Sequence, residues 1–338
     1  MHPVLYDIFR KSSALVPLSI LIRITGQGLV LPLYHVISDN PLKHIKHLYK
    51  VLDSKTFEKD IDFLLKNYEV VTPEYLIKCA ENPELRKNKA FLITFDDGLR
   101  EFYEVAAPIL KRKGVPAICF LNSDFVDNKD LFYRLKVSLL IEEINKVEPS
   151  NSAFIKIRSA FEAYGLIYRG ASDLLKIKFI NKKLLDKVAE IISFDFQSFL
   201  KNTQPYMNLS EIKELEKQGF YFGAHSVNHP EFRFIDSTEQ QFQINESLKF
   251  VQNNLHPQSN FFAFPFTDYG LDKSFFESIK PQVDISFGTA NLKLDDIPSN
   301  FQRIPMEIPN RSDAQTILKT EYLIFYAKKI FGLERIKR

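Results

Sequence analysis

The chain has 338 residues, of which 45% are hydrophobic and 26% charged, a balance that excludes global disorder. This length predicts one large domain or two smaller ones, with a sizeable buried core. The 45 lysines and arginines nearly balance the 42 aspartates and glutamates, so net charge gives no indication of a nucleic-acid partner. Two cysteines, Cys79 and Cys119, are too few for a disulfide framework.

The N-terminal segment contains an apolar run, Ser12–Ile22, with basic residues on both sides. The run is too short to span a bilayer, Pro17 interrupts it, and no small-residue cleavage pattern follows it. We therefore expect residues 1–28 to form a helical segment that packs on the domain or lies on a membrane surface. A secretion signal is the less favoured interpretation.

Several short apolar runs are nearly continuous rather than alternating, which is typical of parallel strands that are buried on both faces. These runs are Leu29–Val36, Ala90–Phe95, Ala117–Leu121, Phe220–Ala224, Phe261–Phe266 and Val283–Phe287. Helical patterns lie between some of them, at Thr56–Asn67, at Leu99–Lys113 and after the capping-box pair Asn208 and Glu211. Strands that alternate with helices predict an α/β fold whose parallel sheet is either open or closed into a barrel.

Between residues 124 and 204 the pattern changes to helices alone. Leu131–Ile144 and Leu184–Ile192 have helical spacing, with charged residues between the apolar ones. We interpret this block as a helical insertion in a domain that spans residues 29–310. The remaining segment, residues 311–338, combines apolar and basic residues and predicts a basic amphipathic helix that packs on the domain or lies on anionic lipid.

Two adjacent carboxylates, Asp96 and Asp97, follow directly after an apolar run, and Gly98 comes next. Neighbouring side chains of a regular strand point to opposite faces, so both acids can serve one site only if the backbone turns where the strand ends. Gly98 permits such a turn. The carboxyl ends of parallel strands are where α/β proteins place their sites. An ordinary solvated Asp-Asp-Gly turn is the alternative interpretation.

Two histidines, His225 and His229, follow another apolar run and are four residues apart. In a helical turn this spacing puts both imidazoles on one face, which suits metal chelation, and Pro230 keeps such a turn short. Together with Asp97 the histidines would leave one coordination position open, as in hydrolytic metal sites. Asp96 would then stay free as a general base. A histidine pair that binds no metal is the alternative.

The strings Thr94–Gly98 and His225–His229 resemble the first two motifs of the polysaccharide deacetylases, the NodB-homology carbohydrate esterases of family 4. Leu33–His35 and Phe264–Phe266 are similar to that family in order and character. The resemblance covers roughly residues 29–310 apart from the helical block. It implies a distorted (β/α) barrel of the polysaccharide deacetylase type, with the helical block as an insertion and a metal site at the strand ends.

In the family's pattern the first aspartate is the catalytic base, and the second joins both histidines on a divalent metal, often zinc. Carried over to this chain, Asp96 is the base, and the metal ligands are Asp97, His225 and His229. The implied reaction is hydrolysis of the N-acetyl amide of an amino sugar in surface-polysaccharide or cell-wall glycan metabolism. The metal would polarise the acetyl carbonyl and acidify a water molecule whose proton Asp96 takes.

Two later motifs of the family are altered here. The third motif normally supplies an arginine that orients the base, but Ala263–Phe266 lacks it. Arg303 is the candidate that reaches the base from another strand, with an ordinary salt bridge as the alternative. The fifth motif normally supplies a histidine as general acid, yet no histidine follows His256. His35 and Asp268 are the candidate acids, although isolated residues at strand ends also commonly have a structural role.

These features predict a metal-dependent N-deacetylase whose partner is an N-acetylated sugar or glycan, polymeric or lipid-linked, and not a nucleic acid. A second interpretation keeps the same site but assigns it a different bond, the amide of a formamido sugar or another linear amide. A third is a non-catalytic glycan-binding protein that retains the metal. The expected location is cytoplasmic and peripheral to a membrane; no feature of the sequence specifies the oligomeric state.

Overall fold

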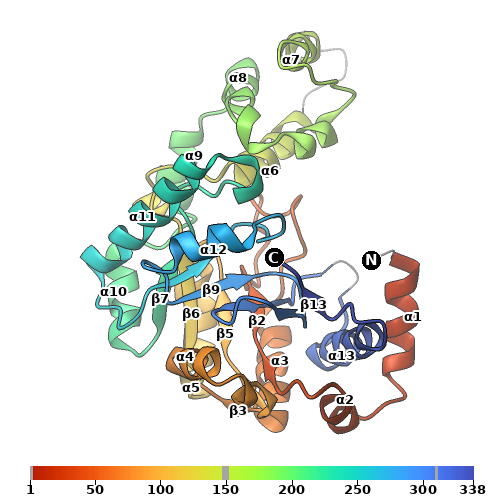
Figure 1. Ribbon diagram of the computed structural model, residues 1–338. Helices are drawn as coiled ribbons and strands as arrows, with labels where there is room; N and C mark the ends of the chain where they lie inside the picture. Colours follow the sequence, from red (N-terminus) through yellow and green to blue (C-terminus); the bar gives the residue numbers. More distant parts are fainter. Residues whose placement is uncertain (1–2, 147–151, 309–310) are drawn as a thin grey trace.

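The structure, a computed structural model, describes residues 3–146, 152–308 and 311–338. Its centre is an eight-stranded sheet in which all neighbouring strands are parallel and which curls into a nearly closed barrel (Figure 1). In order across the sheet the strands are β11 (Asn300–Gln302), β9 (Ile285–Gly288), β8 (Phe261–Ala263), β7 (Tyr221–Ala224), β6 (Ala117–Leu121), β5 (Ile93–Phe95), β2 (Pro32–Tyr34) and β12 (Ile304–Pro305). The expected distorted (β/α) barrel is therefore confirmed.

One short segment supplies both edges of this sheet. Strand β11 pairs with β9, strand β12 pairs with β2, and only Arg303 separates the two strands. The backbone N–H of Arg303 donates to the carbonyl of Gly288 at 3.1 Å, and the next N–H, of Ile304, donates to Leu31 at 2.9 Å. The chain thus crosses from one edge of the sheet to the other within a single residue, and this crossing brings the two edges together.

The register of the central strands aligns their carboxyl ends. Phe95 lies beside Cys119, and Leu121 lies beside Ala224, so β5, β6 and β7 end close together. Two bonds extend this alignment past the strands, because the N–H of Asp96 donates to Tyr34 at 3.1 Å and that of His225 to Leu121 at 2.8 Å. Apart from the half-buried Tyr221, the residues of these three strands are buried on both faces, as their continuous apolar sequence predicts.

Helices surround the barrel: α3 (Ser54–Asn67), α4 (Pro73–Glu81), α5 (Ala107–Arg112), α10 (Leu209–Lys217), α11 (Ser237–Asn254) and α12 (Lys273–Ile279). The predicted capping box at the start of α10 is present, with the side chains of Asn208 and Glu211 each bonded to the other's backbone N–H. Smaller sheets are formed by β1 (Leu29–Val30), β4 (Ala90–Phe91) and β3 (Glu69–Val70), and by β10 (Leu294–Asp295) with β13 (Arg335–Ile336).

The two ends of the chain pack together: helices α1 (Pro3–Ser13) and α2 (Leu18–Thr25) lie against α13 (Ala314–Ile330) (Figure 1). The helix expected through residue 338 instead ends at Ile330, because Gly332 has a φ of 66° and the chain continues into β13. Most of α13 is buried, so it is a packed element of the domain rather than a free amphipathic helix. None of the described helices is long and apolar enough to cross a membrane. Membrane contact and a cytoplasmic location stay predictions.

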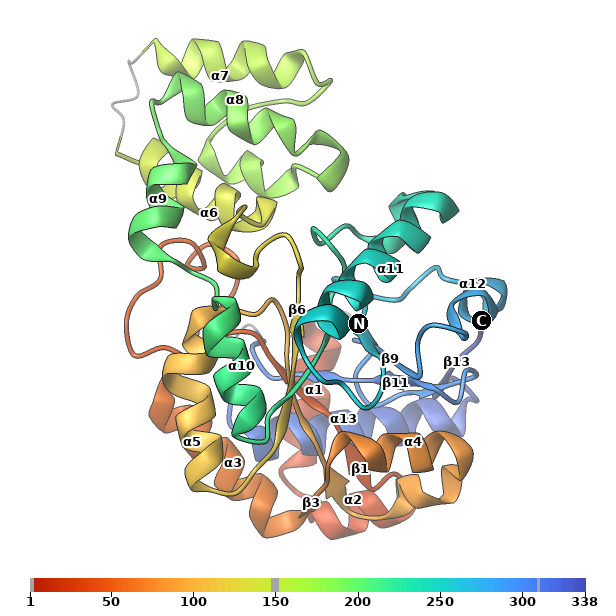
Figure 2. The same cartoon turned by 90° about the vertical axis from the view of Figure 1, so that its left-hand side faces the viewer.

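The block after β6 forms a separate group of helices, α6 (Tyr133–Ile144), α7 (Ala153–Glu162), α8 (Lys183–Ile191) and α9 (Phe196–Thr203), that rises above one end of the barrel (Figure 2). Its buried apolar residues make a hydrophobic cluster distinct from the one inside the barrel. Since the block begins just after β6, it stands at the carboxyl end of the strands. The predicted domain boundaries stay predictions, and the one at residue 310 lies outside the described residues.

Candidate metal centre

Asp96 and Asp97 lie where β5 ends and the backbone turns. Asp97 has a φ of 71° and Gly98 a φ of 64°, so two successive residues take the left-handed conformation. Aspartate tolerates this conformation better than most residues, and glycine does so without steric cost. The turn that the adjacent acids require is therefore present, and both carboxylates are buried at the barrel end.

The two histidines lie on a turn rather than a helix. His225 directly follows β7, and both Ser226 and His229 have positive φ values, of 68° and 63°. The hydroxyl of Ser226 accepts the N–H of His229 at 3.1 Å, and Gln243 of α11 accepts the N–H of Val227 at 2.9 Å. These bonds hold the turn in place, so both imidazoles point toward the aspartates. A concentration of residues in the left-handed backbone conformation is typical of functional sites.

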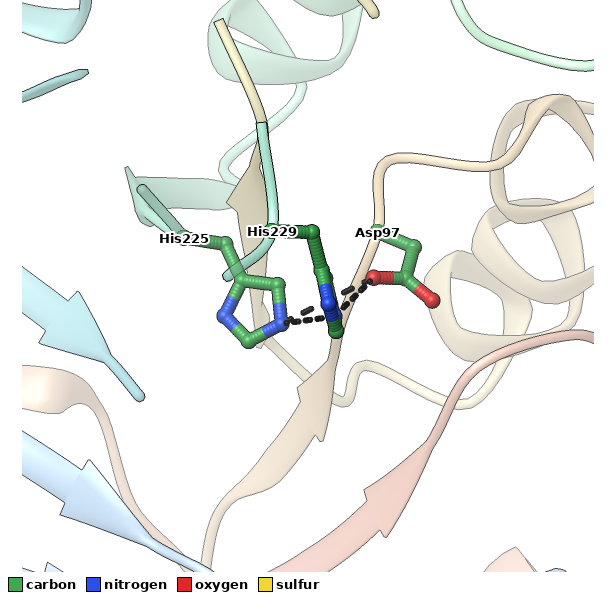
Figure 3. A group of neighbouring side chains, drawn as sticks. All are labelled: Asp97, His225 and His229. Carbon is green, nitrogen blue, oxygen red and sulfur yellow. Dashed lines mark hydrogen bonds and ion pairs between the residues drawn. The ribbon is translucent and has the colours of Figure 1, made fainter. Parts of the chain in front are cut away.

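The three expected metal ligands converge on one point (Figure 3). The Nε2 atoms of His225 and His229 are 3.2 Å apart, and Asp97 Oδ1 lies 3.6 Å and 3.2 Å from them, respectively. Tetrahedral zinc ligands 2.0–2.2 Å from the ion lie about 3.3–3.6 Å from one another. The spacing thus fits an ion at the centre of the group.

The chemistry of the donors also fits a cation. His225 Nδ1–H donates to the carbonyl of Ala263 at 2.8 Å, which leaves the Nε2 lone pair facing the group. Burial lowers the pKa of His225 to about 4, although the negative charge of Asp96 acts to raise it. The imidazole is therefore neutral. Among the described residues, Asp97 Oδ1 is buried without a hydrogen-bond donor. A divalent cation held by Asp97, His225 and His229 would satisfy this oxygen.

Asp96 lies beside these ligands and is held by Arg303. The guanidinium donates to both carboxylate oxygens, at 2.6 and 2.8 Å, and is itself 0% exposed. Burial alone would raise the pKa of Asp96, but the charge of Arg303 and its hydrogen bonds hold the pKa below its usual value. The carboxylate is therefore ionised, with Oδ2 3.8 Å from the Nε2 of His225. The structure thus brings Arg303 to the expected base from the junction between β11 and β12.

His35 directly follows β2 and is held by Glu307, which sequence reasoning missed. Its Nδ1–H donates to Glu307 at 2.6 Å, and the same carboxylate accepts the backbone N–H groups of His35 and Val36. Burial lowers the pKa of His35, but the charge and hydrogen bond of Glu307, with the charges of Asp97 and Asp96, raise it to about 9. At neutral pH this side chain is an imidazolium that is 27% exposed. The only signal for Glu307 in the sequence is its position two residues after the short strand β12.

Asp268 belongs to a different buried cluster. Its carboxylate accepts hydrogen bonds from Asn300 and Gln302, both at 2.7 Å, and pairs closely with Arg338. A Cβ added at Gly288 would lie 2.4 Å from this carboxylate, so the cluster is tightly packed. Within the described residues these contacts all involve Oδ2, and none of them joins Asp268 to the proposed ligands. They favour the structural alternative for Asp268.

Aromatic side chains cover one side of the centre. The rings of Phe132 and Phe266 lie 4.1 and 4.6 Å from the imidazole of His229, measured between centroids. Phe266 comes three residues after the short strand β8 and has a φ of 59°. Phe132 comes from the helical insertion, and sequence reasoning had no reason to place it here. The rings keep water from one side of His229 and so strengthen its electrostatic interactions.

Comparison with known proteins agrees with this geometry. A sequence model of the polysaccharide deacetylase family matches residues 84–149 and 189–275, which contain both aspartates and both histidines. The chain contains a polysaccharide deacetylase domain. The gap between the two matched ranges falls inside the helical insertion, and the deacetylase domain continues on both sides of it.

A curated relative of this deacetylase domain is YxkH of Bacillus subtilis (strain 168), whose name as a polysaccharide deacetylase is itself provisional. The two are 31% identical over 99 residues, which are 29% of this chain and 33% of that protein. The match thus spans about a third of the length of the relative.

Solved deacetylase structures share the fold. Streptococcus pyogenes deacetylase PplD, in complex with acetate, has a TM-score of 0.56 and 15% identity, covering 87% of this chain and 97% of that one. IcaB from Ammonifex degensii has a TM-score of 0.51 and 16% identity, covering 88% and 97%. The de-N-acetylase from Aggregatibacter actinomycetemcomitans has a TM-score of 0.51 and 14% identity, covering 86% and 99%. The deacetylase-type barrel is therefore shared along nearly the whole length of these chains.

Proposed function

We propose that this polysaccharide deacetylase domain hydrolyses the N-acetyl amide of an amino sugar within a glycan, using a divalent cation. The observation that carries the proposal is the convergence of Asp97, His225 and His229 beside the ionised carboxylate of Asp96. Two imidazoles and one carboxylate are the ligand set of hydrolytic zinc sites, so zinc is the ion that we expect. The names of the relatives support a polysaccharide substrate, which we assign to surface-polysaccharide or cell-wall metabolism.

Each of these residues has a separate role in the proposed reaction. Asp97, His225 and His229 would hold a divalent ion, which would supply a Lewis acid for the acetyl carbonyl and lower the pKa of water toward ~7. Asp96 takes a proton from the attacking water, and Arg303 keeps the carboxylate oriented and ionised. The oxygen of that water bonds to the carbonyl carbon, the C–N bond breaks, and the products are acetate and the free amine of the sugar.

The departing amine needs a proton, and we assign its donation to His35. Among the candidates, His35 is the one that is both cationic and partly exposed beside the charges of Asp96 and Asp97. Glu307 receives three N–H bonds from the His35–Val36 segment and so fixes the imidazole at the end of β2. This pair takes the place of the histidine that the fifth family motif normally supplies.

Acetate release and metal content test the proposal together. Purified wild-type protein should contain about one zinc-like ion per chain and release acetate from chitopentaose. Chelation or His225→Ala should lower the rate by ~10³-fold or more, since several kcal/mol of carbonyl polarisation are lost. Added zinc should restore the chelated wild type but not the variant.

His256→Ala is the matched control, because the side chain of His256 is 93% exposed and should leave metal and rate unchanged. Full activity after complete metal removal would exclude the metal mechanism. Release of formate from a formamido sugar without acetate release would support the other linear-amide interpretation. Binding of chitopentaose by metal-loaded protein, with neither product released, would favour the glycan-binding interpretation.

His35→Asn should lower the rate by about 10²- to 10⁴-fold and change the pH profile. The active form is the imidazolium, and its pKa is raised from 6.5 to about 9, so wild-type activity is present at lower pH and is lost as pH rises through that pKa. A bound cation repels the imidazolium, which puts the midpoint of this alkaline decrease at or below pH 9. His35→Asn should abolish the decrease, and Glu307→Gln should move it to lower pH. The same alkaline decrease in His35→Asn would assign the proton donor elsewhere.

A further inference from the structure

A cleft of about 900 Å³ lies between the helical insertion and the barrel, beside the metal centre. Residues 175–183 and Tyr133 form the wall on the insertion side, and residues 231–239 form the wall on the barrel side. Phe266 lies at their junction, and its ring packs against the imidazole of His229 at 4.6 Å. The cleft therefore extends outward from the edge of the proposed metal site.

Aromatic side chains contribute to both walls of the cleft. Phe234 on the barrel side is 58% exposed and Phe266 is 39% exposed, which is unusual for phenylalanine. Tyr133 and Phe179 face them from the insertion side, with their ring centroids 6.0 Å apart. Exposed aromatic surfaces in a cleft next to a reactive centre are typical of ligand-binding sites.

The charge on the insertion wall is positive, and Lys176 of this wall pairs with Asp173 at 2.6 Å. Lys178, Lys182 and Lys183 line the cleft, and within residues 3–146, 152–308 and 311–338 no carboxylate lies within ion-pair distance of them. The ammonium groups of Lys182 and Lys178 lie 4.1 and 5.1 Å from the rings of Phe179 and Phe234, respectively. Cations are thus held against the aromatic surfaces of the cleft.

The acids on the opposite wall make ion pairs or hydrogen bonds within that wall. Glu231 pairs with Arg233 at 2.5 Å. Asp236 caps α11 by accepting the N–H of Glu239, and the Glu239 carboxylate accepts a hydrogen bond from Gln243 at 2.8 Å. Within the described residues, none of these acids lies within ion-pair distance of Lys178, Lys182 or Lys183, and Glu239 attracts Lys182 only at longer range. The three lysines are therefore available for a negatively charged ligand.

We propose that this cleft binds an anionic glycan, whose sugar rings lie on the aromatic residues and whose carboxylate or phosphate groups pair with Lys178, Lys182 and Lys183. The inference rests on the proposed function and specifies its substrate class. Each hydrolysed amide leaves a protonated amine on the glycan, and neighbouring lysines repel that charge. Anionic groups on the glycan offset the repulsion, whereas a neutral polymer of N-acetylated sugars has nothing to offset it.

Calorimetric titration of the full chain tests the inference with oligosaccharides that differ in charge. The probes are chitohexaose, which is neutral, hyaluronan hexasaccharide, which carries carboxylates, and chitotetraose 1-phosphate. At low salt the wild type should bind at least one anionic probe about tenfold more tightly than chitohexaose, and the preferred probe identifies the anion. The triple variant Lys178→Gln, Lys182→Gln, Lys183→Gln should lose this preference.

A second triple variant, Lys55→Gln, Lys59→Gln, Lys66→Gln, removes the same charge from exposed positions of α3 and should keep the preference. Equal affinity of the wild type for all probes would overturn the inference, as would an anion preference that persists in the cleft variant or disappears in the α3 variant. Acetate release is measured separately from binding. Anion-selective binding without acetate release from any probe would exclude the proposed hydrolysis and still support the anion-binding cleft.

Discussion

Replacing Asp96 by asparagine is expected to lower acetate release by about 10²- to 10⁴-fold while the bound metal stays at the wild-type level. Asparagine has the same shape and still accepts a hydrogen bond from Arg303, but it cannot take a proton from water. The three proposed ligands are different side chains, so metal binding does not depend on the change. Measurement of acetate production and metal content on the same protein sample checks both halves of the expectation.

Asp97→Asn is the matched control, since it makes the same chemical change one residue along the chain. Asp97 Oδ1 lies within 3.6 Å of both imidazoles, so this variant should lose metal together with activity. The contrast between the two variants separates the base from the ligand. Full activity in Asp96→Asn would show that Asp96 is not the base, and loss of metal in both variants would show that Asp96 is itself needed to hold the ion.

Replacing Arg303 by methionine is expected to lower the free energy of unfolding by about 3–5 kcal/mol, because it leaves Asp96 as a buried carboxylate without its partner. Both side chains are almost completely buried, and Phe120 and Phe287 lie 5.3 and 5.9 Å from the guanidinium. Arg303 also sits where the chain joins the two edges of the barrel. Urea unfolding at pH 7 measures the loss.

The pH dependence of this loss has a defined sign. Arg303 lowers the folded-state pKa of Asp96, so the stabilisation is present above the unfolded-state pKa of about 3.9 and is lost as pH falls through the lower folded-state value. The difference in stability between wild type and Arg303→Met should therefore shrink in acid. The double variant with Asp96→Asn should recover part of the loss, because no charge is then left unpaired.

Arg112→Met is the control for removal of an arginine. Its side chain is 61% exposed and lies 3.7 Å from Glu58, so its loss should change stability by no more than about 0.5 kcal/mol. A comparable small effect for Arg303→Met, or a double variant that is no more stable than the single one, would show that the buried pair contributes little to folding.

Local features of the sequence predicted most of the barrel strands. The run Ala117–Leu121 is β6 residue for residue, and the run Phe220–Ala224 contains β7, because strands buried on both faces must be continuously apolar. The C-terminal segment was less predictable. Its basic amphipathic pattern predicted a helix to residue 338 but gave no sign that α1 and α2 pack against α13. Burial of that helix depends on packing partners about 300 residues away in the sequence, as in the hydrogen bond between Ser13 and Thr320.

By itself the sequence determined where the proposed metal ligands and the proposed base emerge, because polar residues that directly follow a buried strand must lie at its end. Only the tertiary structure decided what surrounds them. Arg303 reaches Asp96 across 207 residues of chain, and Glu307 holds His35 across 272. Asp268 meets the same strand-end criterion, yet its carboxylate is bound in a separate cluster with Arg338. The reason is physical: hydrophobic patterning specifies which residues form strands, whereas strand register and barrel closure determine which strand ends meet.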